Sequence, residues 1–267
     1  MEPVTIRKLF KKKKEGKKIT MISTYDYLTA KFCQEAGIDS VLVGDSLGMV
    51  FQGLDTTLPV TLDEMIYHAK AVRRGAPDLF LIVDMPFMSY QVSVEEALRN
   101  CGRVMKETGA QAVKLEGGEE IAEVVSRLVS AGIPVVGHLG FTPQSVHKFG
   151  GPKVVGKTEE EEEKLRKDFR ILQEAGAFMI VLESVPWKIA KELTETSDVI
   201  TIGIGAGRYC DGQVLVFHDL VGLYGDKKPK FVRRYLEGAK MFVEALRRFK
   251  IDVERGDFPS EEESYGA

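Results

Sequence analysis

Ionisable side chains stand at the C-terminal ends of five successive apolar segments of this 267-residue chain. A single acid in such a place is more typical of a helix N-cap or of the protein surface than of a binding site. Five in succession indicate one site, because the loops that follow the strands of an α/β barrel meet around one mouth. The residues are Asp45 with Ser46, Asp84, Lys114 with Glu116, His138, and Glu183.

Asp45 and Asp84 are predicted to hold a divalent metal. They follow neighbouring strands, which lie about 5 Å apart in a sheet, so both carboxylates can reach one cation. Carboxylate oxygens suit Mg²⁺, which keeps several positions for water and substrate. A 2-oxo acid would fill two of these positions, and the metal would stabilise the enolate that forms when the adjacent carbon loses its proton. Zinc is disfavoured, because His138 is the only histidine at these strand ends and no cysteine joins it.

Glu183 is the predicted general base for that proton. It follows the apolar run Ile180–Leu182, and apolar surroundings would raise its pKa toward neutrality, as such a role requires. The alternative is that Glu183 caps a helix that begins near Pro186.

Lys114 is a candidate cation for the substrate carboxylate or the enolate oxygen, and Glu116 a candidate holder of a metal-bound water. The two residues lie two apart on one face of a strand. The alternative is therefore a simple ion pair between them.

The elements that must position these residues are short β-branched runs separated by segments of helical period, a pattern typical of a parallel sheet built from βα units. Eight such runs predict a (β/α)8 TIM barrel. They are Ile19–Ser23, Ser40–Val43, Leu79–Val83, Ala112–Leu115, Pro134–Gly137, Phe178–Leu182, Val199–Ile202 and Val214–Phe217.

Helix starts are marked by hydroxyl residues three positions before a glutamate. Thr61, Ser93 and Thr158 precede Glu64, Glu96 and Glu161, which is the capping-box pattern. In the third of these helices Leu165, Phe169 and Leu172 form one apolar stripe, and the acidic run 159–163 is predicted to face solvent.

No linker or internal repeat divides the chain, so residues 1–267 are predicted to form a single barrel domain. A polar N-terminal segment covers about residues 1–18, and its lysine run, 11–14, is interpreted as solvated rather than as a phosphate-binding patch. An acidic C-terminal tail covers about residues 252–267 and is expected to be a poorly ordered extension or a surface brace.

Composition narrows the possible partners. A net charge of -3 does not favour nucleic acid or a membrane surface as a ligand. No segment approaches the roughly 20 apolar residues of a membrane span, and no hydrophobic leader is recognised, so we expect a soluble, cytoplasmic protein. The three cysteines are far apart in sequence and are expected to be reduced and mostly buried.

The glycine-rich segment Gly203–Gly207 is similar to a nucleotide-binding loop only superficially. It is followed neither by a convincing helix nor by the acid that would bind a ribose. Its glycines are expected to let the backbone pass close to a substrate or to a neighbouring loop.

Taken together, the motifs resemble the ketopantoate hydroxymethyltransferase family over nearly the whole chain. One departure is Phe141, where leucine is common in the family. The matching segments are residues 43–46 (VGDS), 84–87 (DMPF), 113–118 (VKLEGG), 137–145 (GHLGFTPQS), 203–207 (GIGAG) and 211–216 (DGQVLV).

The resemblance implies a magnesium-dependent transfer of a one-carbon unit from 5,10-methylenetetrahydrofolate to 3-methyl-2-oxobutanoate, giving 2-dehydropantoate and tetrahydrofolate. It further implies a homo-oligomer, often a decamer. By position, Asp45 and Asp84 match the metal ligands, with Glu116 a third contact through water. Glu183 matches the general base, and Ser46, Asp84 and Lys114 match contacts to the oxo acid. Asp45 also lies at this substrate site, and His138 matches a histidine near it.

Three other interpretations stay open on the sequence alone. One is a metal-dependent lyase or mutase of the isocitrate lyase type, although no cysteine here stands where such enzymes carry one in a mobile loop. Another makes Lys114 a Schiff-base nucleophile without a metal. The last is a barrel without catalytic activity that serves as a binding protein, which five charged strand ends disfavour.

Overall fold

The computed structural model describes residues 2–224 and 228–266. It contains two compact units, Met1–Phe217 and His218–Ala267. The first unit holds every predicted site residue.

All eight strands are parallel and form one closed barrel in sequence order, β1 pairing with β8. This confirms the predicted (β/α)8 fold. The strands are β1 (Ile19–Ser23), β2 (Ser40–Val43), β3 (Phe80–Asp84), β4 (Ala112–Glu116), β5 (Val135–Gly140), β6 (Met179–Glu183), β7 (Ile200–Ile204) and β8 (Gly212–Val216).

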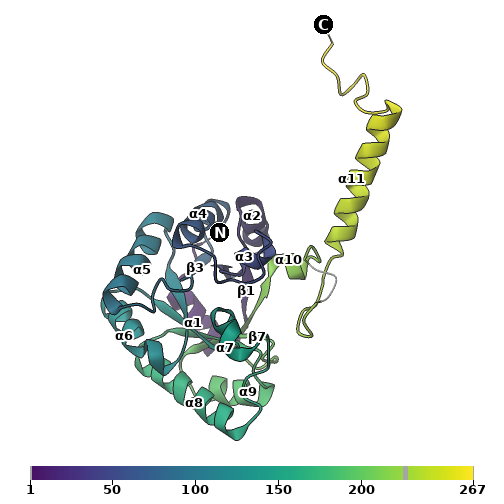
Figure 1. Cartoon of the computed structure of the whole chain (residues 1–267). Coiled ribbons are helices and arrows are strands. Elements are labelled where there is room, and N and C mark those ends of the chain that lie inside the picture. The colour runs from purple at the N-terminus through teal and green to yellow at the C-terminus, as the bar shows by residue number, and fades with distance from the viewer. Residues whose placement is uncertain (1, 225–227, 267) are drawn as a thin grey trace. The chain divides into compact units, whose positions relative to one another are not determined.

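Helices surround the strands, as Figure 1 shows for α4, α5, α6, α8 and α9. Short elements, among them α3, α7 and two 3₁₀ turns, lie in the loops that leave β2, β4 and β5. The helices are α1 (Ile6–Lys14), α2 (Tyr27–Glu35), α3 (Leu47–Val50), α4 (Leu62–Gly75), α5 (Val94–Thr108), α6 (Ala122–Ser130), α7 (Val146–Phe149), α8 (Glu159–Glu174), α9 (Trp187–Glu195), α10 (Phe217–Leu220) and α11 (Gly238–Arg255), with the 3₁₀ turns η1 (Glu119–Ile121) and η2 (Pro143–Ser145).

The three predicted hydroxyl caps begin α4, α5 and α8, but only one is a full capping box. Thr61 and Glu64 satisfy each other's backbone N–H groups at the start of α4. At α8 the hydroxyl of Thr158 accepts from the N–H of Glu161, while the carboxylate of Glu161 accepts instead from the N–H groups of Gly156 and Lys157. This difference turns Glu161 toward the preceding loop.

The N-terminal segment is a helix that packs into the barrel core. Leu9 of α1 is fully buried in the same apolar cluster as residues from the strands. Lys12 pairs with Asp39, just before β2, and Lys13 pairs with Asp211, just before β8. Helix α1 therefore closes the barrel at the N-terminal ends of its strands, and these two lysines are structural partners rather than solvated charges.

Strand β7 passes to β8 without a helix in the described chain. Residues 205–211 make the whole connection, and Gly207, with φ 82°, is part of it. A Cβ on Gly207 would lie 2.5 Å from the Cβ of Trp187, so glycine is required where this loop passes the start of α9. The glycine-rich segment was expected to pass close to a substrate or to a neighbouring loop. In the structure Gly207 passes close to Trp187, the first residue of α9.

The second unit contains the 18-residue helix α11. It has an apolar stripe whose members are exposed: Phe242, Leu246, Phe249 and Val253. The helix ends at Gly256, in the left-handed conformation that commonly terminates helices, so residues 252–255 of the predicted tail are helical.

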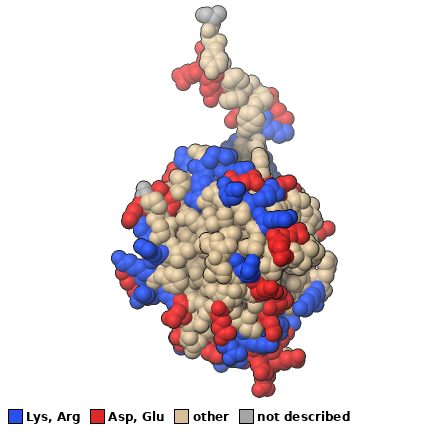
Figure 2. All heavy atoms as spheres, turned by 90° about the vertical axis from the view of Figure 1, so that its left-hand side faces the viewer, with Lys and Arg blue, Asp and Glu red and all other residues tan. Residues whose placement is uncertain are grey.

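Surface charge is mixed on the face drawn in Figure 2, where acidic and basic side chains are interspersed around an uncharged central area. Among the described residues, no helix is both long and apolar enough to cross a membrane. All three cysteines are free and buried, as predicted.

Candidate active site

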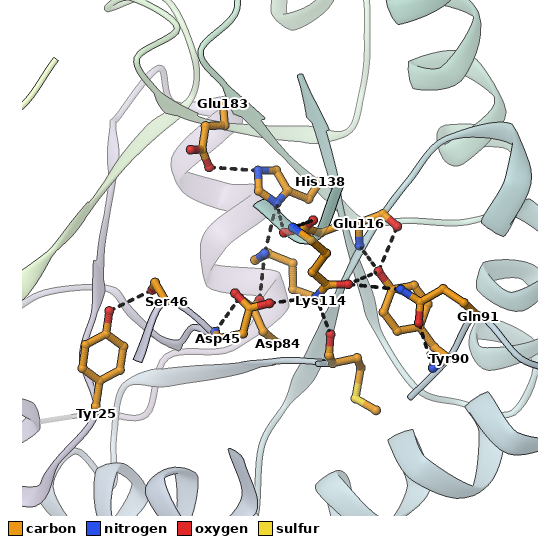
Figure 3. Close-up of polar contacts among 12 residues, drawn as sticks. Tyr25, Asp45, Ser46, Asp84, Tyr90, Gln91, Lys114, Glu116, His138 and Glu183 are labelled. Atoms are coloured by element: carbon orange, nitrogen blue, oxygen red, sulfur yellow. Dashed lines mark hydrogen bonds and ion pairs between the residues drawn. The ribbon is translucent and has the colours of Figure 1, made fainter. Parts of the chain in front are cut away.

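The predicted residues lie together at the C-terminal ends of β2 to β6, and polar contacts join all of them except Ser46, which contacts Tyr25 instead (Figure 3). Asp45 and Ser46 follow β2, as expected. Asp84, His138 and Glu183, expected after their strands, are instead strand residues of β3, β5 and β6. Each of these polar side chains has an ionisable partner on a neighbouring strand, which permits burial of a polar group.

Asp45 and Asp84 are both 3% exposed. The backbone N–H of Asp45 donates to Oδ2 of Asp84 over 3.2 Å, so the two carboxyl groups are neighbours. Burial, followed by the charge of Asp84, raises the pKa of Asp45 well above its usual range, and burial likewise raises the pKa of Asp84. Lys114 supplies one positive charge to this pair, and a divalent cation on the carboxylate oxygens would neutralise the negative charge that remains.

The carboxylates therefore fit a hard cation such as Mg²⁺. Residues 2–224 and 228–266 contain no group of three His, Cys, Asp or Glu side chains arranged as direct metal ligands.

Lys114 is a buried cation paired with Asp84. Its Nζ lies 2.8 Å from Oδ1 of Asp84 and 3.2 Å from Nδ1 of His138. Burial acts to lower the pKa of Lys114, but the charges of Asp84 and Glu116 outweigh burial and raise it above its usual value. The alternative of a Lys114–Glu116 ion pair is replaced by the pair with Asp84.

His138 joins two carboxylates. Its Nδ1 lies 3.3 Å from Oε1 of Glu116, and its Nε2 lies 3.1 Å from Oε2 of Glu183. Burial and the charge of Lys114 act to lower the pKa of His138, but the contacts with Glu116 and Glu183 outweigh them and raise it to about 9. The imidazole therefore connects the metal-facing half of the site to Glu183.

The side chain of Glu183 is 17% exposed, more than the other carboxylates of the network. The sequence predicted apolar surroundings, and the structure adds the polar contact with His138. Glu183 does not cap the next helix, since α9 begins after Pro186 without a side-chain cap. Its carboxylate is thus available at the mouth.

Gln144 is a site residue that the sequence reasoning missed. Its Nε2 donates to Oδ2 of Asp45 over 2.8 Å and to the carbonyl of Met85 over 2.9 Å. Its backbone N–H donates to Oε2 of Glu116 over 2.9 Å. One residue therefore orients two of the predicted metal-facing carboxylates, and its only sequence signal was its place in the segment 137–145.

Two tyrosines were missed as well. The hydroxyl of Tyr90 lies 2.9 Å from Oε1 of Gln144 and accepts from the N–H of Glu116 over 3.0 Å. The hydroxyl of Tyr25 lies 2.8 Å from Oγ of Ser46. Both tyrosines are at most 1% exposed, so each fixes its polar partner from within the core.

Strained backbone lies in two loops of the mouth. Met88, after β3, has φ 65°, and Ser184, directly after Glu183, has φ 51°; they are the only non-glycine residues with positive φ in the described chain. Such conformations cost of order 1 kcal/mol and collect at functional sites. The strain at Ser184 fixes the direction in which the chain leaves the candidate base.

The amino-acid sequence is similar to one family model and to named enzymes that carry the same activity in their names. Residues 3–261 match the family model described as Ketopantoate hydroxymethyltransferase. A 3-methyl-2-oxobutanoate hydroxymethyltransferase of Aquifex aeolicus is 70% identical over 263 residues, covering 98% of this chain and 99% of that protein. An enzyme of the same name from Thermus thermophilus is 53% identical over 251 residues, covering 94% and 96%.

Solved structures of similar fold are more distant in sequence. Phosphonopyruvate hydrolase in complex with oxalate and Mg²⁺ superposes with a TM-score of 0.63 at 13% identity, covering 97% of this chain and 93% of that one. A 2,3-dimethylmalate lyase, described as a PEP mutase/isocitrate lyase superfamily member, gives 0.60 at 16% identity, covering 97% and 91%. At these identities the likeness concerns the fold alone.

Proposed function

The chain belongs to the ketopantoate hydroxymethyltransferase family and is a transferase, and from this premise we propose the reaction in full. A one-carbon unit passes from 5,10-methylenetetrahydrofolate to C3 of 3-methyl-2-oxobutanoate, giving 2-dehydropantoate and tetrahydrofolate. One water balances the reaction by supplying the oxygen of the new hydroxyl group. The observation that carries the proposal is the buried network of Asp45, Asp84, Lys114, His138 and Glu183 at one barrel mouth.

Asp45 and Asp84 would hold Mg²⁺, with Glu116 contacting it through water. Once bound, the metal supplies positive charge that stabilises an enolate oxygen. The support is the pair of adjacent buried carboxylates whose pKa values are raised by burial.

The oxo acid would lie against Asp45, Ser46, Asp84, Lys114 and His138. Lys114 offers a charged N–H donor to the substrate carboxylate or keto oxygen, and Asp84 fixes the position of that ammonium group. Tyr25 restricts the hydroxyl of Ser46, so the rotation of this second donor is limited before substrate binds.

Glu183 would remove the C3 proton. Its carboxylate is held by the imidazole of His138 at the mouth, and this contact restricts its rotation. Proton transfer requires the base to come within hydrogen-bond reach of the reacting group, and a carboxylate whose rotation is restricted at the mouth favours such an approach.

A Schiff-base mechanism on Lys114 is disfavoured, because that nucleophile must be a neutral amine and the pKa of Lys114 is raised. Borohydride reduction with the oxo acid present tests this alternative. Covalent trapping on Lys114 would exclude the metal-enolate proposal.

The proposal is tested by exchange of the C3 proton of 3-methyl-2-oxobutanoate in deuterated water, followed by NMR. We expect exchange that EDTA stops and Mg²⁺ restores, and that Glu183→Gln abolishes while oxo-acid binding is retained. Glu163→Gln, an exposed acid of α8, is the matched control and should exchange normally. Exchange that survives in Glu183→Gln would show that another group is the base.

Assembly into a homo-oligomer, and specifically a decamer, remains part of the proposal. Its support is the exposed apolar stripe of α11 (Phe242, Leu246, Phe249 and Val253), since contiguous exposed apolar side chains commonly mark protein interfaces. Light scattering coupled to size-exclusion chromatography measures the mass, and a monomer would contradict it. Nucleic acid and membranes are not proposed as partners, and cytoplasmic location stays a prediction.

A further inference from the structure

Residues 150–157, here called the strap, connect α7 to α8 beside the barrel mouth and contain no helix or strand. The strap starts with Gly150 and Gly151, whose φ angles are 71° and 120°. A Cβ on either glycine would meet no atom within 4 Å, so this end of the strap has room to turn. Such a pair can absorb backbone rotation, as hinge residues do.

One carboxylate holds the far end of the strap. Oε2 of Glu161, in the first turn of α8, accepts from the backbone N–H of Gly156 over 3.0 Å and of Lys157 over 2.9 Å. Its Oε1 accepts from Nζ of Lys153 over 2.6 Å. The bond from Lys153, followed by those from the two backbone groups, lowers the pKa of Glu161 to about 2, so the carboxylate is charged at neutral pH. Hydrogen bonds to an ionised acceptor are stronger than those between neutral groups.

Helix α8 gives this carboxylate a firm attachment. Leu165 and Phe169 of α8 are buried, and the hydroxyl of Thr158 caps the helix without the side chain of Glu161. The carboxylate of Glu161 therefore serves the strap rather than the helix.

Elsewhere the strap is weakly held. Within the described chain, residues 152–157 make one backbone–backbone hydrogen bond, from the N–H of Val155 to the carbonyl of Ser184 over 2.9 Å. Pro152, Lys153 and Val154 are exposed. Segments with few backbone hydrogen bonds and few buried contacts open at a low cost in free energy. The contacts with Glu161 are therefore the main attachment of the strap.

The contact with Ser184 lies one residue after the proposed base. Ser184 has φ 51°, and its own N–H donates to the carbonyl of Ile204 over 2.8 Å. A Cβ on Gly140 would lie 2.2 Å from the carbonyl oxygen of Glu183, so β5 encloses the backbone there as well. Strained backbone persists only where neighbouring groups hold it. Val155 of the strap is one of these groups.

The strap also forms part of the wall of the mouth. Phe149, directly before the strap, and Val155 line a cavity of about 390 Å³ that His138 also lines. Movement of the strap would therefore open the surroundings of His138 to solvent.

We propose that Glu161 is a positioning residue that latches the strap onto Ser184 and thereby fixes the direction of Glu183. In the closed state, Val155 helps to hold the strained backbone that follows Glu183. In the open state, the strap turns about its first two glycines, that hydrogen bond is lost, and Glu183 no longer has a fixed direction. The effect on the reaction rests on the proposed function, whereas the latch itself does not.

Hydrogen–deuterium exchange measured by mass spectrometry tests the latch. In Glu161→Ala, peptides that cover residues 150–157 should exchange at least about tenfold faster, because hydrogen bonds to a charged group contribute strongly to local stability. Glu161→Gln keeps an acceptor for the two N–H groups and should give an intermediate rate. Glu160→Ala is the matched control, since it removes the same charge from the same helical turn, and exposed Glu160 forms no hydrogen bond with the strap within the described chain.

Exchange of the oxo acid's C3 proton then measures the effect on the base. At saturating oxo acid, Glu161→Ala should exchange this proton roughly tenfold more slowly, because a misplaced reacting group is costly. The oxo-acid concentration at half-saturation should stay within about twofold, since Asp84 and Lys114 hold each other on β3 and β4. Glu160→Ala should behave like the unmodified protein in both respects.

Unchanged deuterium uptake by the strap of Glu161→Ala would overturn the latch. Faster uptake throughout the chain would overturn it too, because that pattern indicates a loss of stability alone. An open strap with a normal rate of C3 exchange would refute the positioning of Glu183. If the unmodified protein exchanges no C3 proton, the proposed function fails, and deuterium uptake by the strap still decides whether the latch exists.

Discussion

Replacing Gln144 with methionine removes the side-chain amide that holds Asp45 while keeping a similar volume. The amide donates to Oδ2 of Asp45 over 2.8 Å and to the carbonyl of Met85 over 2.9 Å, and it accepts from Tyr90 over 2.9 Å. Tyr90 keeps a second acceptor in the carbonyl of Glu116. The substitution therefore leaves two buried acceptors without this donor.

Each buried acceptor left without a donor costs about 1–3 kcal/mol, so the free energy of unfolding should fall by about 2–6 kcal/mol. Metal affinity should fall roughly 10- to 100-fold, the usual effect of removing a residue that orients a ligand. Electron paramagnetic resonance of Mn²⁺, used in place of Mg²⁺, measures the affinity, and urea unfolding measures stability.

Gln91→Met is the matched control. Gln91 donates to the same Oε1 of Gln144 over 3.1 Å but is exposed and does not contact Asp45. It should change stability by about 0.5 kcal/mol or less and leave Mn²⁺ affinity unchanged. A Gln144→Met protein that loses stability but binds Mn²⁺ normally would refute the orienting role and leave Gln144 a packing residue.

Three further outcomes are expected. Because burial raises the folded-state pKa of Asp45 and Asp84 above the unfolded value of about 3.9, their contribution to stability is complete below that pH and is lost as pH rises through the folded pKa. Thermal unfolding with EDTA should show this decline; Asp45→Asn should reduce it and should abolish stabilisation by Mg²⁺. Burial raises the pKa of Cys33 and Cys101 to about 12, so a thiol reagent at pH 8 should modify them only after unfolding in urea; rapid reaction of the folded protein would contradict this. Leu9→Ala should cost about 2–5 kcal/mol in urea unfolding because Leu9 is fully buried where α1 closes the barrel.

Sequence patterns predicted the barrel because its strands are apolar runs of uniform length, but they placed several strand ends too early. Asp84, Glu116, His138 and Glu183 belong to strands, whereas hydropathy treats an ionisable residue as the start of a loop. Their burial depends on partners from other strands, which a single segment cannot reveal.

Of two other differences between prediction and structure, helix α1 and Gln144, only the first had a local signal in the sequence. Ile6, Leu9 and Phe10 repeat with helical spacing, which indicates an amphipathic helix beneath the lysine run. Gln144 had no such signal, because an uncharged amide is distinguished only by the two carboxylates it contacts, 99 and 28 positions away.

Charge balance links the separate parts of the site. Asp45, Asp84, Glu116 and Glu183 bring four carboxylates to the mouth, and Lys114 and His138 bring two cations. When all six groups are ionised, two negative charges remain uncompensated in a region where water screens little. Burial raises the pKa of Asp45 and of Asp84, so protons on these two carboxyl groups reduce this excess in the metal-free protein, and one divalent cation would relieve it fully. Metal binding should therefore release protons and strengthen as pH rises. Lys114 cannot replace the metal, because its single charge is already included in that balance.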